Sequence, residues 1–265
     1  MTLPNYEIFA LRYADIVKRT RNENFIAHDP HEENMPMDYF VWVIRNDDRV
    51  VLVDTGFSQR QATERGRNLM RCPIKSLSLL GIAPEQIDDV IITHLHYDHA
   101  GNIDLIPRAQ FHIQDAEVDY ACGRHMCHGL FRHAYDVENV VDLVRRVYAD
   151  RVSFHDGEYT LAPGIELVKI GGHTKGLQSV RVHTARGWVV LASDASHYYE
   201  NMDKPSPFPI VFHVGDMLAG YDKLRGLADS ADHIVPGHDP LVRVKYPFWG
   251  DPVNDIVALH LPPKA

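Results

Sequence analysis

The stretch that decides the fold is Thr93-His94-Leu95-His96-Tyr97-Asp98-His99-Ala100-Gly101, which follows an apolar run at residues 90–92. It offers four potential metal ligands, three imidazoles and one carboxylate, within six residues. These are the groups that zinc-like divalent cations prefer, and catalytic sites keep one coordination position open for water. The stretch is not decisive by itself, because histidine-rich tracts also occur on solvent-exposed loops.

Three later segments each supply one more candidate ligand at the end of an apolar run. They end at His173, Asp194 and His238. The seven candidates then sort into two sets and one carboxylate that is able to bridge them. The first set is His94, His96 and His173, the second set is Asp98, His99 and His238, and the bridging carboxylate is Asp194. Two metal ions roughly 3.5–4 Å apart can share a hydroxide, so the pattern predicts a dinuclear metal site.

With these residues in this order, the chain resembles the hydrolases of the metallo-β-lactamase fold, and it is most similar to the N-acyl homoserine lactonase family. The family pattern HxHxDH, then His, Asp and His, matches all seven positions, and the resemblance extends from Tyr39 to Pro240. It implies an α/β fold, a four-layer αββα sandwich in which helices flank two mixed β-sheets. We expect one such domain over residues 1–265.

The resemblance also implies an activity. We expect an enzyme, a metal-dependent hydrolase of ester or lactone bonds, which opens an N-acyl homoserine lactone or a related cyclic ester by attack of a metal-bridging hydroxide. The resemblance implies two divalent metal ions, with zinc as the preferred candidate. Manganese, iron and cobalt share the same ligand preferences. Asp98 is the expected proton carrier to the leaving oxygen. Activity on homoserine lactones would make the protein a quorum-quenching enzyme.

The chain departs from the family pattern at two places. One is Leu177, where many relatives carry a histidine, and the other follows the bridging aspartate. In the lactonases that this chain resembles, a tyrosine three residues after the bridging aspartate hydrogen-bonds the substrate carbonyl. Here His197 occupies that spacing, and Tyr198 and Tyr199 follow it. Either His197 is the donor, or one of the tyrosines reaches the carbonyl through a small backbone shift.

Other segments have two readings each. Asp54, at the end of an apolar run, either orients a ligand imidazole or caps a turn. The N-terminal loop at residues 16–38, which we call the leader loop, covers its own site or embraces a second subunit. Apolar candidates for the entrance are Phe25, Met35 and Met37. The segment Pro205–Phe212, with Phe208 and Phe212, is the opposite wall or a packed loop.

Periodicity and turn residues predict the elements that surround these motifs. Strands are expected at residues 39–45, 49–54, 89–93, 110–114, 152–154, 159–161, 165–170, 179–183 and 188–192. Helices are expected at residues 59–69, 137–148 and 216–227, the last of which should close the fold.

Composition indicates an ordinary enzyme that acts on a small molecule. The formal charge of -9 and the pI near 6.0 argue against nucleic acid or an anionic membrane as the main partner, because both require clustered cations. No apolar run reaches the ~20 residues that a membrane span needs. Three cysteines cannot all pair internally, so we expect reduced thiols in a cytoplasmic protein. We expect either a monomer or a homodimer.

Two rival functions use the same ligand set. A thioester hydrolase similar to glyoxalase II shares all seven ligands, but such enzymes normally add a C-terminal helical extension, and this chain ends soon after His238. A non-catalytic, metal-bound ligand-binding protein is the other alternative. The complete ligand set and the retained Asp98 argue against it.

Overall fold

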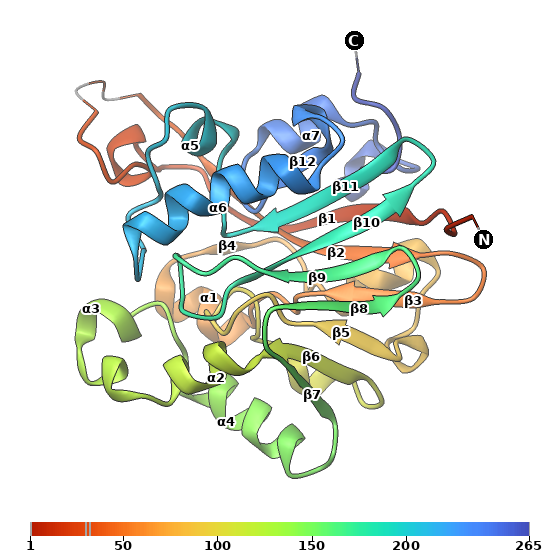
Figure 1. The fold of residues 1–265 in the computed structure, drawn as a ribbon, viewed down its shortest axis with the longest axis horizontal. Helices are drawn as coiled ribbons and strands as arrows, with labels where there is room; N and C mark the ends of the chain where they lie inside the picture. The colour runs from red at the N-terminus through yellow and green to blue at the C-terminus, as the bar shows by residue number, and fades with distance from the viewer. Residues whose placement is uncertain (1, 30, 32, 265) are drawn as a thin grey trace.

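The computed structural model describes residues 2–29, 31 and 33–264. Two β-sheets pack face to face, and helices cover the outer face of each sheet (Figure 1). Both sheets contain parallel and antiparallel strand pairs, so both are mixed. The four-layer αββα sandwich predicted from the sequence is therefore confirmed.

The first sheet has the strand order β13-β1-β2-β3-β5-β6-β7, and β4 pairs with β1. Its strands are β1 (Glu7–Ile16), β2 (Met37–Arg45), β3 (Val50–Val53), β4 (Asn68–Leu69), β5 (Asp89–Ile91), β6 (Gln110–Gln114), β7 (Val152–His155) and β13 (Ile256–Ala258). The second sheet has the order β12-β11-β10-β9-β8. Its strands are β8 (Glu158–Ala162), β9 (Ile165–Lys169), β10 (Gln178–Thr184), β11 (Gly187–Ser193) and β12 (Ile234–Pro236).

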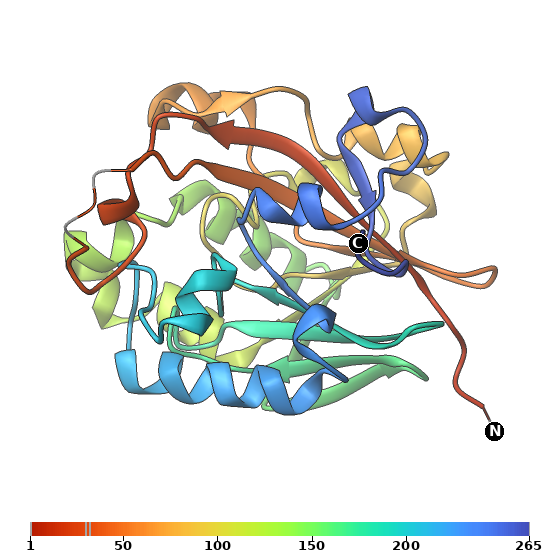
Figure 2. The ribbon, with the colours of Figure 1, turned by 90° about the horizontal axis from the view of Figure 1, so that it is seen from above.

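The helices are short, apart from two. They are α1 (Gln59–Arg65), α2 (Asp115–Ala121), α3 (Gly129–Arg132), α4 (Val137–Val147), α5 (Tyr199–Asp203), α6 (Val214–Leu227) and α7 (Leu241–Lys245). Helix α6 runs along the outer face of the second sheet (Figure 2). Helices α1, α2 and α4 pack on the other side of the molecule, against the first sheet.

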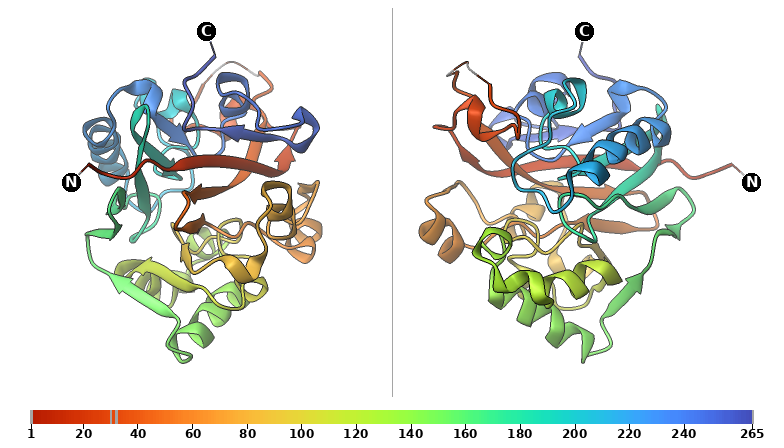
Figure 3. Two further views of the ribbon diagram at one scale, coloured as in Figure 1. Left: turned by 90° about the vertical axis from the view of Figure 1, so that its right-hand side faces the viewer. Right: turned by 60° about the vertical axis from the view of Figure 1, so that its left-hand side comes forward.

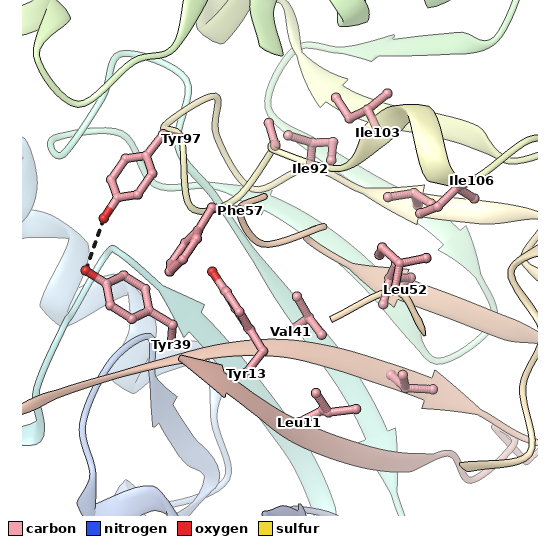
Figure 4. Packing of buried hydrophobic residues seen from close by; sticks show 14 of the residues in the cluster. Leu11, Tyr13, Tyr39, Val41, Leu52, Phe57, Ile92, Tyr97, Ile103 and Ile106 are labelled. Carbon is pink, nitrogen blue, oxygen red and sulfur yellow. Dashed lines mark hydrogen bonds between the residues drawn. The ribbon is translucent and has the colours of Figure 1, made fainter. Parts of the chain in front are cut away.

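Three buried apolar clusters hold the layers together. The cluster between the sheets brings Trp42 and Val53 of the first sheet against Val180 and Leu191 of the second. A second cluster joins α6 to the outer face of the second sheet. The third lies under α1, α2 and α4, where Tyr39 and other aromatic side chains gather beside the ligand stretch (Figure 4).

Several element predictions need correction. Strand β1 was not expected, yet it is long and almost wholly buried because it lies between β2 and β13, covered on both faces. The helix expected at residues 59–69 ends at Arg65, because Gly66 adopts a left-handed conformation with φ of 63° and the chain continues into β4. Helix α6 does not close the fold, since α7 and β13 follow it.

In the described part of the chain, the helices are all too short or too polar to cross a bilayer. The leader loop, of which residues 30 and 32 lie outside the described residues, lies next to α5 (Figure 3). Hydrogen bonds join it to that region, among them one from the Ile26 amide to the Pro207 carbonyl at 2.7 Å.

Candidate metal centre

The candidate ligands follow the ends of strands that reach one edge of the sandwich. His94 comes shortly after β5, Asp194 directly after β11, and His238 two residues after β12. His173 is reached from β9 through Gly171 and Gly172. At Gly172 φ is +84°, and a Cβ would lie 2.6 Å from the Met217 amide nitrogen, so only glycine fits where this loop packs on α6.

The first group consists of three buried imidazoles and one carboxylate. Ligand atoms from His94, His96, His173 and Asp194 all lie within 4.8 Å of one another. The Nε2 atom of His173 is 3.0 Å from the Nδ1 atom of His96 and 3.2 Å from Oδ2 of Asp194. The Oδ2 atom of Asp194 also lies 3.7 Å from Nε2 of His94.

The second group lies on the other side of the same carboxylate. Ligand atoms of Asp98, His99 and His238 lie within 4.8 Å of one another. Oδ1 of Asp194 is 3.3 Å from Nε2 of His99 and 3.0 Å from Nε2 of His238. The two carboxylate oxygens of Asp194 therefore face the two groups separately, as a bridging ligand requires.

Hydrogen bonds to the far ring nitrogens orient the imidazoles. Nδ1 of His99 is 2.7 Å from Oδ2 of Asp54, which also accepts the hydroxyl of Thr93. Nδ1 of His173 and of His238 lie 2.7 and 2.9 Å from the carbonyl oxygens of Ile210 and Asp38. Such partners fix the tautomer and direct Nε2 toward a metal. Of the two interpretations of Asp54, the structure supports the one in which it orients the imidazole of a candidate ligand, His99.

Burial and neighbouring charges shift the pKa values of the candidate ligands in different directions. Burial opposes protonation of His99 and His238, but the carboxylates around them, Asp194 first, raise the pKa of both, so a bound cation would have to displace a proton there. Burial lowers the pKa of His94 and of His96 well below the usual value, which keeps both imidazoles neutral. Burial alone would raise the pKa of Asp194, but the imidazoles around it, His197 first, bring that pKa well below its usual range. Neutral imidazoles around an ionised carboxylate are the ligating forms.

The donor set fits a pair of metal ions. The Nε2 atoms of His94 and His99 are buried, face the centre, and have no hydrogen-bond partner among the described residues. Orphaned buried nitrogens are costly, and a cation at each group would satisfy them. Five imidazoles and two carboxylates suit zinc and the metals close to it.

A cavity of about 430 Å³ opens over the two groups. The candidate ligands that line its floor are His96, Asp98, His173, Asp194 and His238. Its walls come from the leader loop, from the segment after α1, from the segment after α3 and from the segment after α5. The cavity is therefore large enough for a small molecule beside the candidate metal centre.

The three candidates for contact with a substrate carbonyl lie in different places. His197 lines the cavity, with its Nε2 atom 3.1 Å from Oδ2 of Asp194 and its ring stacked on Phe208 at 3.7 Å. The Tyr198 side chain is fully buried, and its hydroxyl donates to the Pro36 carbonyl at 3.2 Å. Tyr199 lines a separate hollow with Tyr198. The predicted catalytic contact of Tyr198 does not fit this placement, because its hydroxyl is already engaged away from the cavity.

Some of the residues predicted to form apolar walls line the cavity, and others lie elsewhere. Met37 and Phe208 line the cavity. Met35 instead lines the hollow beside Tyr199, and Phe212 packs against Tyr120. Phe25 is buried beneath the guanidinium of Arg21.

Several residues of the site were not expected from the sequence. Tyr39 and Tyr97 line the cavity, and their hydroxyls lie 3.1 Å apart (Figure 4). Arg19, Arg65 and Arg67 line it as well. Of these residues, Tyr97 alone could have been predicted from the sequence, because it lies inside the ligand stretch. The arginines lie in a loop and at a helix end, where an exposed cation is ordinary.

The comparisons with known proteins agree with this geometry. The model of the metallo-beta-lactamase superfamily matches residues 35–238. A probable metallo-hydrolase of Mycobacterium tuberculosis is 27% identical over 230 residues, which are 76% of this chain and 71% of that protein. An N-acyl homoserine lactonase of Bacillus cereus is 27% identical over 191 residues, 66% of this chain and 70% of its own.

A solved N-acyl homoserine lactone hydrolase, with the product N-hexanoyl-L-homoserine bound at its catalytic metal centre, shares the fold. Its TM-score is 0.74 at 22% identity, over 92% of this chain and 96% of that one. Because the family model covers more than half of the sequence, the chain belongs to the metallo-beta-lactamase superfamily. It is a metallo-hydrolase of lactonase-like fold whose histidine and aspartate clusters suit a dinuclear metal site.

Proposed function

We propose that this protein opens a lactone ring by hydrolysis. Two divalent metal ions, with zinc as the preferred candidate, would bind in two groups and share the carboxylate of Asp194. The first group is His94, His96 and His173, and the second is Asp98, His99 and His238. The observation that carries the proposal is the division of the Asp194 carboxylate, whose Oδ1 and Oδ2 atoms each face one ligand group at 3.0–3.7 Å. The similarity to a Bacillus cereus N-acyl homoserine lactonase supports the choice of a lactone.

Bound metals would supply an activated water and polarise the carbonyl that is attacked. The chain's own groups would do the rest. Asp98 lies at the floor of the cavity with its Oδ2 atom 3.8 Å from Nε2 of both His99 and His238, so it is placed to pass a proton to the leaving alkoxide. His197 is the candidate donor to the substrate carbonyl. Burial lowers its pKa to about 3, so its ring is neutral and carries one N–H.

The test is a substrate panel on metal-reconstituted protein: N-acyl homoserine lactones, simple lactones, a thioester and a β-lactam, each with and without a chelator. We expect chelator-sensitive ring opening of lactones to exceed the other reactions. Thioester cleavage as the dominant activity would favour the glyoxalase II-like alternative. Metal binding without turnover of any substrate would favour a ligand-binding protein. A quorum-quenching role follows only if homoserine lactones lead the panel.

A further inference from the structure

Three arginines project into the cavity above the candidate metal centre. Arg65 is the last residue of α1, Arg67 follows it across the left-handed Gly66, and Arg19 comes from the leader loop. All three guanidinium-bearing side chains are half-buried. Two separate segments of the chain thus bring cations to one cavity.

Among the described residues, the three guanidinium groups donate their hydrogen bonds to neutral partners. Arg67 donates to the Tyr97 hydroxyl at 3.0 Å and to the Arg65 carbonyl at 2.9 Å. Arg65 donates to the carbonyls of His133 and Tyr135 at 2.7 and 2.9 Å.

Arg19 donates to the Asn24 side chain and to the Glu23 carbonyl. Among the described residues, no carboxylate lies within 4.0 Å of Arg19, Arg65 or Arg67, whereas Arg12, Arg21 and Arg243 each pair with at least two.

In the part of the chain that the structure describes, the acidic groups of the cavity do not balance all three positive charges. Asp98 and Asp194 belong to the candidate metal centre, where bound cations would consume their charge. The Glu23 carboxylate also lines the cavity; it accepts the Thr20 amide at 2.7 Å and the Thr20 hydroxyl at 3.0 Å, and the charges of Arg19 and Arg67 help to lower its pKa. This single carboxylate offsets one of the three positive charges. Half-buried cations that outnumber the nearby counter-charges are costly, and a fork of guanidinium donors matches the oxygens of a carboxylate or a phosphate.

Aromatic rings connect Arg65 and Arg19 to the residues at the floor of the cavity. The Arg65 guanidinium is 4.0 Å from the centroid of the Tyr97 ring, and the Tyr97 hydroxyl is 3.1 Å from that of Tyr39, whose ring packs on His238 at 5.1 Å.

On the opposite wall, the Arg19 guanidinium is 5.0 Å from the centroid of the Phe208 ring, which is stacked on His197 at 3.7 Å. An anion held by these arginines would thus lie in the same cavity as the reacting carbonyl, on a substituent of the same substrate.

We propose that the substrate carries an anionic group, a carboxylate or a phosphate, and that Arg19, Arg65 and Arg67 bind this group beside the metal centre. The inference rests on the proposed lactone hydrolysis and names the class of lactone. An acyl homoserine lactone with a purely alkyl chain would leave the excess of positive charge unbalanced. A lactone with an anionic substituent would offset it.

The test compares homoserine lactones whose acyl chains, two to six carbons long, differ only at the far end: methyl, carboxylate, the amide of that carboxylate, or phosphate monoester. With the zinc-loaded full chain, we expect kcat/KM for a charged lactone to exceed that for the amide by about tenfold or more. The better of the two charged ends identifies the anion. Arg67→Gln and Arg19→Gln should bring the ratio of charged to amide substrate toward one.

Arg60→Gln is the matched control. Arg60 lies on the same helix as Arg65 but pairs with Glu64 and Asp136 and does not line the cavity, so the ratio should be unchanged. Substitution of Arg65 is avoided, because its bonds to two carbonyls hold the segment after α3. Equal kcat/KM for charged and amide lactones, or a ratio that Arg67→Gln and Arg19→Gln leave intact, would overturn the inference.

A binding measurement separates this inference from the proposed function. The corresponding lactams, in which NH replaces the ring oxygen, are titrated calorimetrically into the same proteins. We expect charged lactams to bind about tenfold more tightly than their amides, and Arg67→Gln to remove the difference. If no lactone is opened but this difference is present, the lactonase proposal fails and the anion site stands. Equal affinities would reject the anion site whatever the turnover.

Discussion

The carboxylate of Glu117 accepts the backbone amide of Leu95 at 2.9 Å, and Leu95 separates the predicted ligands His94 and His96. The same carboxylate accepts the hydroxyl of Thr174 at 2.5 Å and the amide of Gly176 at 3.1 Å, both just after His173. One buried side chain of α2 thus joins the two loops that supply the first ligand group. The backbones of Gly176 and Glu117 pack closely, because a Cβ on Gly176 would lie 2.1 Å from the Glu117 amide nitrogen.

Glu117→Gln should weaken the first metal group and destabilise the fold. The amide places an NH2 group where only donors converge, so we expect a loss of about 2–4 kcal/mol in the free energy of unfolding. Metal affinity at the first group should fall about 10- to 100-fold, because the loops that hold the ligands are released. Urea unfolding and competitive chelation measure the two effects.

Glu85→Gln is the control for this change, since Glu85 is exposed in the turn before β5. It should leave both quantities at the wild-type values. Wild-type metal affinity in a folded Glu117→Gln protein would show that Glu117 supports packing alone and not the ligand loops.

Asp54→Asn should affect the second group selectively. Asp54 adopts a left-handed conformation with φ of 61°, which asparagine tolerates as well, so the substitution removes the charge behind His99 without new backbone strain. We expect the affinity of one metal ion to fall about 10- to 100-fold while the other stays bound.

Metal stoichiometry during a chelator titration, followed by elemental analysis, resolves the two ions. Asp88→Asn, at an exposed position, controls for a generic loss of charge. Simultaneous loss of both ions would mean that Asp54 stabilises the whole centre and does not orient His99 in particular.

Asp98→Asn should remove turnover. A proton carrier typically contributes 10²- to 10⁴-fold, so kcat should fall by about 100-fold or more for the best lactone. Kinetics are read only on protein shown by elemental analysis to hold two metals. Asp104→Asn, an exposed neighbour, should be fully active. Near-normal kcat in a two-metal Asp98→Asn protein would refute the proton-carrier role.

Glu200 should hold the leader loop against α5. Both oxygens of its carboxylate accept hydrogen bonds from the Arg21 guanidinium. Glu200→Gln should increase hydrogen exchange of residues 17–29 and raise KM more than it lowers kcat, because Arg19 and Glu23 of this loop line the cavity. Lys204→Met, which removes only the exposed partner of Glu200, should do neither.

The same contact has a defined pH dependence. The hydrogen bond from Arg21 lowers the pKa of Glu200 below its ordinary 4.5. Stability from a lowered carboxyl pKa is present above the ordinary value and is lost as the pH falls through the folded value. Leader-loop protection should therefore persist down to pH 4.5 and disappear below it, as limited proteolysis across that range would show. Release of the loop between pH 7 and 5 would contradict this assignment.

The sequence predicted the fold and the convergence of the seven candidate ligands, because short motifs after apolar strands are local signals. Their binding of metal remains a prediction. Strand β1 was missed since its residues are buried on both faces and show no alternation. The sequence also did not distinguish His197 from Tyr198. The chain turns between β11 and α5, and only tertiary packing decides that the Tyr198 hydroxyl reaches Pro36.

Contacts between segments that are distant in sequence could not be predicted, for a further reason. Glu117 is an acidic residue in the first turn of a short helix, where a carboxylate is usually exposed and favoured by the helix dipole. Its burial depends on Leu95 and Gly176, which are remote in sequence. Likewise, the role of Arg19, Arg65 and Arg67 can be inferred only from the structure, because it brings the leader loop and the end of α1 together over one cavity.

The most direct test of the central claim is anomalous diffraction at the zinc edge from crystals of zinc-loaded protein. We predict two peaks per chain, about 3.5–4 Å apart, with the two oxygens of Asp194 directed to different peaks. A single peak, or two peaks with both Asp194 oxygens on one ion, would contradict a centre bridged by this carboxylate.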